Sequence, residues 1–346
     1  MENRVINLPA VTVGIAGRMK FEALKAVLDE DGNQVYDENG HALAYEDTRR
    51  LLADWMPNQI LDNGRNVMSE ISGSPHNGWL SSAQVGTDST LPDAAQQQLF
   101  AYIAGTADAT AQASAEASSP YYAWNRITYR FPAGPIGTQN LQEAGVGWNT
   151  ASGAFLVSRA LIVDAVGTPT PVVPAADELL DMTYEIRYYP PETPVVVTNA
   201  VTLNGVDYDV SLSTVNAPGA RASSIGNSIG EFSPDSSYWA AYDGTSGGLA
   251  DSTPNGASAN CDNANQFNLT YQGNTYQIDM QCDCGPTGWN LGSFIRTIRF
   301  TTTVHDYQAE FSESADQPSP GDPIPKDANF TMQFVFRLGW TAATIP

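Results

Sequence analysis

Basic residues are scarce in this sequence. Its 346 residues include 16 Lys and Arg against 38 Asp and Glu, which gives a formal net charge of −22. A protein that follows a phosphate backbone needs a basic surface to release counterions, so the composition argues against nucleic acid as a partner. The same shortage of Lys and Arg argues against binding to an anionic membrane.

Long apolar runs are also lacking. The segment Met1–Lys20 contains Arg4 and Arg18 but no long uninterrupted apolar core, so neither a signal peptide nor a membrane-spanning helix is expected. Charged residues make up 16% of the chain, whereas 42% is hydrophobic and 10% aromatic. This balance predicts a soluble chain with packed cores and a surface rich in uncharged polar residues and Gly.

Cysteine is rare, and the three present lie close together: Cys261, Cys282 and Cys284. One residue separates Cys282 from Cys284, which disfavours a bond between them, and the set lacks the spaced pairs of a structural zinc site. Two interpretations fit the spacing. The thiols are either all reduced within one loop-rich patch, or Cys261 forms a disulfide with Cys282 or Cys284 and leaves the third thiol for another subunit.

The sequence contains no recognisable motif for catalysis or for cofactor binding. The histidines, His41, His76 and His305, are isolated and form no metal-binding pattern, and the chain has neither a nucleophile elbow nor a phosphate-binding loop. We therefore expect no catalytic residue, no metal and no cofactor. Carboxylates are numerous, so a glycan hydrolase with an acid–base pair stays as a weaker alternative.

Alternating apolar and polar residues dominate the remaining pattern. Met182–Tyr189, Met332–Leu338 and Ile127–Phe131 each alternate with period two, which is typical of strands with one buried face. Helical spacing occurs in Ala94–Ile103 and Asp47–Trp55, but both segments also suit a strand or a loop. The sequence predicts a mostly-β protein of antiparallel β-sandwich domains with few short helices.

Two acidic turn signals lie near the start of the chain, at Asp29-Glu30-Asp31-Gly32-Asn33 and Asp37-Glu38-Asn39-Gly40. Such residues favour tight turns, because Asp and Asn bond to nearby backbone and Gly accepts positive φ. The ligand spacing of a calcium-binding EF-hand is not met. The pattern predicts a small N-terminal β-meander.

An internal repeat suggests how the chain is divided. Met182–Arg187 and Met332–Arg337 both read Met-x-aromatic-x-apolar-Arg after a proline-rich approach, and each follows an earlier aromatic and arginine strand. Two related β-sandwich units explain this repeat. The predicted division is an N-terminal β-meander or docking segment at 1–70, a first β-sandwich domain at 71–195, and a second at 196–346 with a long Gly/Ser-rich loop at 216–260.

A series of motifs in the first two thirds carries a family resemblance. In chain order they are Gly17–Ala23, Leu52–Gly64, Tyr121–Phe131, Leu141–Trp148, Ser158–Ile162 and Asp181–Arg187. This order resembles a family of structural proteins of tailed bacteriophages, described as tail, neck or collar components. The resemblance implies a non-enzymatic virion protein of the tail or neck, synthesised in the host cytoplasm. It also implies a homo-oligomer that contacts other tail or neck proteins.

Five arginines on or beside predicted strands are candidate contacts in such an oligomer: Arg126, Arg130, Arg159, Arg187 and Arg337. Arginine and aromatic residues are enriched at protein interfaces, and this chain has few bases to place anywhere. An ordinary solvent-facing position on a strand is the alternative interpretation of each.

Aromatic residues in loop-like sequence suggest an alternative function. Trp239, Tyr242 and Trp289 lie beside polar residues, as glycan-binding aromatics do, although we favour core or interface packing for them. The alternative function is a receptor-binding or glycan-binding tail fibre or baseplate protein. Its partners would be fibre proteins or a glycan of the host surface.

Overall fold

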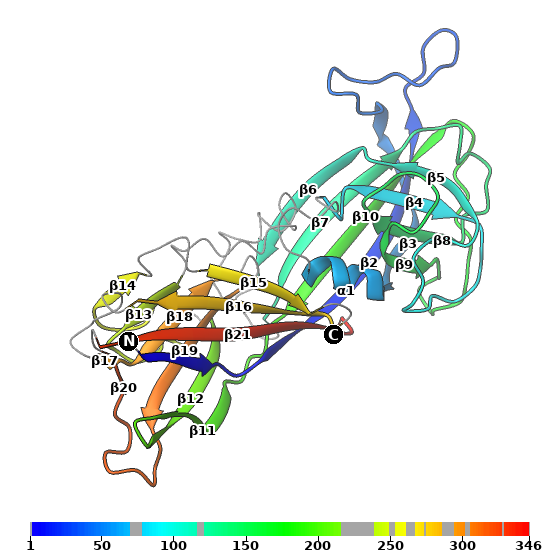
Figure 1. The fold of residues 1–346 in the computed structure, drawn as a ribbon. Helices are drawn as coiled ribbons and strands as arrows, with labels where there is room; N and C mark the ends of the chain where they lie inside the picture. Colours follow the sequence, from blue (N-terminus) through cyan, green and yellow to red (C-terminus); the bar gives the residue numbers. More distant parts are fainter. Residues whose placement is uncertain are drawn as a thin grey trace.

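The computed structural model describes residues 2–69, 78–115, 121–215, 239–248, 253–260, 267–272, 275–285, 294–301, 305–326 and 329–345. The protein is mostly β, as predicted, with 57% strand and, in the described ranges, one helix, α1 (Asp62–Ser69). A large mixed sheet and a six-stranded antiparallel sheet form its body (Figure 1).

The large sheet has 13 strands. They are β1 (Glu2–Asn7), β2 (Val11–Ala26), β3 (Ala44–Ile60), β4 (Ser82–Gly86), β5 (Tyr102–Thr106), β6 (Ala109–Ala115), β7 (Ala123–Phe131), β8 (Glu143–Gly147), β9 (Leu156–Leu161), β10 (Glu178–Tyr189), β15 (Phe267–Gln272), β16 (Gln277–Cys284) and β21 (Phe330–Ala342). The six-stranded sheet consists of β11 (Val195–Leu203), β12 (Val206–Val215), β13 (Trp239–Tyr242), β14 (Ser258–Asn260), β18 (Thr297–Thr301) and β19 (Asp306–Glu313). A separate pair is formed by β17 (Phe294–Ile295) and β20 (Ile324–Pro325).

Strand β2 connects the two ends of the large sheet. Along one edge it pairs antiparallel with β10. Its other neighbours are β3, antiparallel from Gly17 onward, and β21, parallel from Val11 to Ile15. The β1–β21 pairing is also parallel, so the sheet is mixed, whereas the sequence predicted antiparallel pairing throughout. Of the two copies of the Met-x-aromatic repeat, Met182–Arg187 of β10 pairs with β2, whereas Met332–Arg337 of β21 pairs with β16 and, from Met332 to Val335, with β1.

The first core lies on the inner face of β2, β7 and β10. Buried residues alternate with half-buried ones along β7, which places Ile127, Tyr129 and Phe131 on one face. From β3 the sheet continues through β9, β8, β4 and β5, whose apolar residues, including Val85 and Val146, belong to the same buried cluster. The alternation predicted from sequence therefore identifies the face that builds this core.

The second core lies between the β21 end of the large sheet and the six-stranded sheet, and it is rich in aromatic rings. Trp239 of β13 stacks on Phe300 of β18 with 4.8 Å between ring centroids, and Phe300 lies 4.4 Å from Phe336 of β21. Tyr307 of β19 contacts both phenylalanine rings. The segment 216–260, predicted as a loop, contributes two short strands, β13 and β14.

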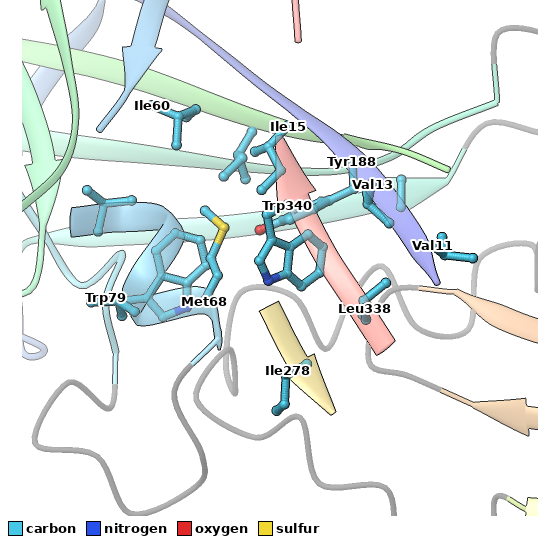
Figure 2. Packing of buried hydrophobic residues seen from close by; sticks show 14 of the residues in the cluster. Val11, Val13, Ile15, Ile60, Met68, Trp79, Tyr188, Ile278, Leu338 and Trp340 are labelled. Atoms are coloured by element: carbon cyan, nitrogen blue, oxygen red, sulfur yellow. The ribbon is translucent and has the colours of Figure 1, made fainter. Parts of the chain in front are cut away.

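One continuous apolar cluster joins the two cores. Figure 2 shows residues of β2, β10, β16, β21 and α1 gathered at the junction. Trp340 of β21 and Tyr188 of β10 meet edge to face there, with 6.1 Å between ring centroids. The two ends of the molecule therefore share both a sheet and a core.

Helix α1 was not predicted, and neither segment with helical spacing forms a helix. Asp47–Trp55 lies within β3, and the residues of Ala94–Ile103 form turns and bends before β5 begins. Within α1, Gly64 lies against β9, where a Cβ atom would come 2.4 Å from the backbone oxygen of Val157. Glycine weakens a helix but permits this close packing, which no local pattern indicates.

Between β2 and β3 the chain forms a projecting arm, defined as residues 27–43, which extends beyond the sheets at the blue end of the colour scale (Figure 1). Three backbone hydrogen bonds link its limbs in a ring. Val27 N donates to Leu43 O (3.0 Å), Leu43 N to Val35 O (2.9 Å) and Val35 N to Val27 O (2.9 Å). The side-chain amide of Gln34 donates to the same three carbonyls. The arm is thus a compact unit with hydrogen bonds of its own.

Both predicted acidic turns lie in this arm and are confirmed. Asp29 and Asp37 each accept hydrogen bonds from two backbone N–H groups two and four residues further along. Gly32 and Gly40 follow with φ angles of 80° and 84°, a region that L-residues with a side chain disfavour.

Candidate functional site

Six bases gather on the outer face of the sheet formed by β3, β2, β10 and β7, opposite the first core. This surface, called the basic face below, consists of Arg18, Lys20, Arg49, Arg126, Arg130 and Arg187 together with Trp55 and Trp124. Strand geometry explains the grouping, because every second residue of β2 and β7 faces away from the core. A chain with 16 bases therefore places six of them on one surface.

The carboxylates of β10 lie beneath these bases. The central position of β10 puts Glu185 between Arg18 of β2 and Arg126 of β7, while Asp181 lies opposite Arg130. Both acidic side chains are only 1% exposed. The sequence predicted one buried face for β10, but both faces are buried, because long arginine side chains from the neighbouring strands cover its short acidic ones.

Glu185 binds three guanidinium groups. Its Oε1 accepts from Arg18 Nε (2.9 Å) and Arg187 Nε (2.7 Å), and its Oε2 accepts from Arg126 Nε (3.0 Å) and Nη2 (2.5 Å). Burial alone would raise the pKa of Glu185, but the three arginines together lower it below the ordinary value. The carboxylate is held as an anion that fixes the positions of three cations.

Asp181 organises a second pair of bases further along β10. Arg130 binds it with two parallel hydrogen bonds, from Nε (2.8 Å) and Nη2 (2.9 Å), and Arg49 Nη1 adds a third at 3.1 Å. The hydrogen bonds to Asp181 are the main cause that raises the pKa of Arg130 above its ordinary value. Paired, bidentate geometry of this kind is the strongest arrangement of an arginine with a carboxylate.

Aromatic rings hold the bases from the other side. The guanidinium carbon of Arg18 lies 4.2 Å from the centre of the Trp55 ring, and that of Arg126 lies 4.6 Å from the Trp124 ring. Arg187 lies 4.5 Å above Tyr122. Flat cations stacked on rings form a semi-rigid surface, because cation–π contact and the buried carboxylates restrain each guanidinium from two sides.

The basic face is accessible at five of its six cations, whereas Arg187 is buried. The side chains of Arg49 and Arg126 are 34% and 33% exposed. A guanidinium has five N–H donors, and the internal ion pairs use only part of that capacity. An open groove of about 420 Å³ adjoins the face, and Arg18, Trp55, Met56 and Pro57 form part of its wall. The combination suits a macromolecular partner that presents carboxylates and an apolar side chain.

Three of the five arginines predicted as contacts lie on this face, and two do not. Arg159 is 0% exposed and pairs internally with Glu143 at 2.8 Å, so it has no surface to offer a partner. Arg337 lies on β21, where it makes an exposed two-bond pair with Asp279 of β16. Sequence alone indicated the residue type but not which arginines share a surface.

The aromatic residues considered for glycan binding are buried where the structure describes them. Trp239 is 0% exposed and Tyr242 is 6% exposed, which confirms core packing for both; Trp289 lies outside the described residues. Cys282 and Cys284 are also buried, and they lie on strand β16 instead of the loop-rich patch that was predicted. Cys261 lies outside the described residues.

Sequence reasoning missed five members of the basic face: Arg18, Lys20, Arg49, Trp55 and Trp124. A signal for the first two was present, since Arg18, Lys20 and Glu22 alternate with Met19, Phe21 and Ala23 in period two. No comparable signal exists for β3, whose pairing with β2 contains register irregularities that interrupt the alternation.

Among the described residues, no group of three or more His, Cys, Asp or Glu side chains is placed to hold a metal ion. No helix in that part of the chain is long and apolar enough to cross a membrane. Comparison of the chain with protein-family models, with curated proteins and with solved structures gave no match.

Proposed function

We propose that this chain is a non-enzymatic assembly protein that binds its partners through the basic face. One observation carries the proposal: six of the few bases in a chain of net charge −22 lie on one sheet surface, fixed by buried carboxylates and stacked on tryptophans. Internal stability alone does not require exposed cations at such a density. Arginine–aromatic surfaces beside an apolar groove are typical of protein–protein contacts.

The setting that we propose for this assembly is the tail or neck of a tailed-bacteriophage virion. The ordered motifs from Gly17 to Arg187 support it, since they resemble structural proteins of such particles. Several of those motifs lie in β2, β7 and β10, the strands that carry the basic face. The partners are then copies of this chain and neighbouring tail or neck proteins.

Association through the basic face is tested with matched variants. Lys20→Glu combined with Arg126→Gln reduces the charge of the face but leaves Arg18 and Arg187 on Glu185. Lys25→Glu combined with Arg337→Gln makes the same charge change at exposed sites outside the face. In sedimentation experiments with the full chain and co-expressed tail or neck proteins, the first variant should lose association and the second should keep it. Equal association of the two variants would contradict the proposal.

Placement in the virion has its own test. Quantitative mass spectrometry of purified particles should find the chain in a fixed ratio to known tail or neck proteins, and deletion should leave particles without a complete tail. Intact particles that fail to adsorb would instead favour the receptor-binding alternative. Absence of the chain from particles would overturn the virion setting.

A further inference from the structure

We propose that the projecting arm (residues 27–43) of one copy of this chain docks on the basic face of a second copy. This inference rests on the proposed function, because it names the occupant of the surface through which the chain is proposed to assemble. The observations that carry it are the chemistry of the arm, its preformed shape, and its complementarity to the basic face and the adjoining groove.

The arm exposes apolar side chains on an acidic background. Leu28, Tyr36 and Leu43 are 40%, 51% and 37% exposed. Between residues 27 and 43 the chain has no Lys or Arg, and its carboxylates are Asp29, Glu30, Asp31, Asp37 and Glu38. Several exposed apolar groups on a small projection rimmed by charge indicate a contact surface more than a solvent-facing turn.

The arm is held in one shape before any partner binds. The ring of backbone bonds and the Gln34 amide fix its limbs, and its base is tied to Arg130 at one end of its own basic face and to the connection between β5 and β6. Arg130 Nη1 donates to Ala42 O (3.1 Å), and the His41 ring bonds to the carboxylate of Asp108. A preformed element loses little conformational entropy on docking, which favours binding through a small area.

The basic face complements this arm in both charge and shape. It presents six bases against four carboxylates, Glu22, Glu46, Asp181 and Glu185, two of which are buried. The acidic arm would therefore meet a locally cationic surface on an otherwise acidic protein. The groove beside Arg18 and Trp55, at about 420 Å³, is large enough to receive the exposed ring of Tyr36 as an anchor.

The arm cannot reach the Glu185 end of the basic face within its own chain. The arm leaves the sheet beside the start of β10, where Ala26 N bonds to Asp177 O. From Glu178 to Glu185 the strand advances roughly 23 Å. Because Arg130 and Asp108 hold the base of the arm in place, its tip points away from that end. A contact between different surfaces of identical chains closes into a dimer when two copies exchange arms reciprocally, and it otherwise builds a ring or a filament.

A mixing experiment tests the inference with full-length chains in analytical ultracentrifugation. The arm variant is Glu30→Lys with Glu38→Lys; both residues are exposed and lie outside the ring of bonds that shapes the arm. The face variant is Lys20→Glu with Arg126→Gln. Each variant alone should self-associate at least about tenfold more weakly than the natural chain, because like charges then meet. A one-to-one mixture should associate again, since the acidic arm of the face variant meets the intact face of the arm variant.

The mixture also controls for folding, because a misfolded variant cannot be rescued by mixing. Asp177→Lys with Asp316→Lys, a matched charge change at exposed sites outside the arm, should leave self-association unchanged. If only the face variant loses association, the arm is not the occupant, and the inference fails while the proposed function stands. If neither variant changes association, both are overturned. A natural chain that stays monomeric at about 100 µM also overturns the inference, because a contact that weak could not assemble the chain by itself.

Discussion

Glu143 and Glu185 are both buried glutamates that bind arginine, yet one lies in a sealed pair and the other under an open surface. Glu143 and Arg159 are each 0% exposed. Glu143 also accepts hydrogen bonds from Phe100 N (3.1 Å) and Ala101 N (2.7 Å), so it organises a loop as well as a base. Glu185 is 1% exposed, but the side chains of Arg18 and Arg126 above it are 23% and 33% exposed.

The contrast separates two uses of the same chemistry. The donors of a sealed pair must find all their hydrogen-bond partners inside the protein. Arg159 accordingly donates also to Thr90 O and to the side chain of Gln96. An open cluster anchors cations from below and leaves their upper surface for a partner. Burial of the carboxylate alone therefore does not distinguish structural arginines from candidate contacts, whereas exposure of the bases does.

The largest effect is expected when the sealed pair is broken. Glu143→Gln keeps the shape of the side chain but leaves Arg159 as a buried cation without a counter-charge, which should lower the free energy of unfolding by about 3–5 kcal/mol. Urea denaturation of the purified chain measures this loss. Adding Arg159→Met should cost less than the sum of the two single changes, because the unpaired cation is then removed. Additive losses would show that the two residues are not coupled.

Breaking the open cluster should have a smaller effect. Glu185→Gln leaves three arginines with a neutral partner, but Arg18 and Arg126 reach solvent and rehydrate, and only Arg187 is buried, so we expect a loss of about 1–2 kcal/mol. The same denaturation experiment applies. The Glu185→Gln variant should also bind its association partners more weakly, because the guanidinium groups lose the carboxylate that anchors all three. A loss as large as that of Glu143→Gln would mean that the two clusters do not differ in kind.

Acid should remove the contribution of Glu185 selectively. The folded-state pKa of Glu185 is lowered from 4.5, so its stabilisation is fully present above that unfolded value and is lost as pH falls through the folded pKa. The difference in urea midpoint between the natural chain and Glu185→Gln should therefore be constant at neutral pH and shrink as the pH falls below 4.5. A difference that stays constant below that pH would show that the carboxylate is not the titrating group.

The strands that form the basic face were only partly predictable from sequence. Alternation identified β7 and β10, and also β21 outside the face, because apolar and polar side chains point to opposite sides of these strands in any tertiary context. The burial of Glu185 could not be predicted, since its partners Arg126 and Arg18 lie 59 and 167 positions away in the chain. Helix α1 escaped detection for a similar reason: its glycine is explained by contact with β9 and not by its own neighbours.

The smallest effect is expected for the pair of Arg337 with Asp279, which is more exposed than the clusters around Glu143 and Glu185. The pair is bidentate, at 2.6 Å and 2.9 Å, but Arg337 is 47% exposed, so water competes for both partners. Asp279→Asn should change the free energy of unfolding by less than about 1 kcal/mol. Added salt should reduce even this effect, because screening acts on exposed charges far more than on the sealed Glu143–Arg159 pair. A loss comparable to that of Glu185→Gln would mean that bidentate geometry affects the free energy of unfolding more than exposure does. The number of hydrogen bonds in a pair, and not its burial, would then set its contribution to stability.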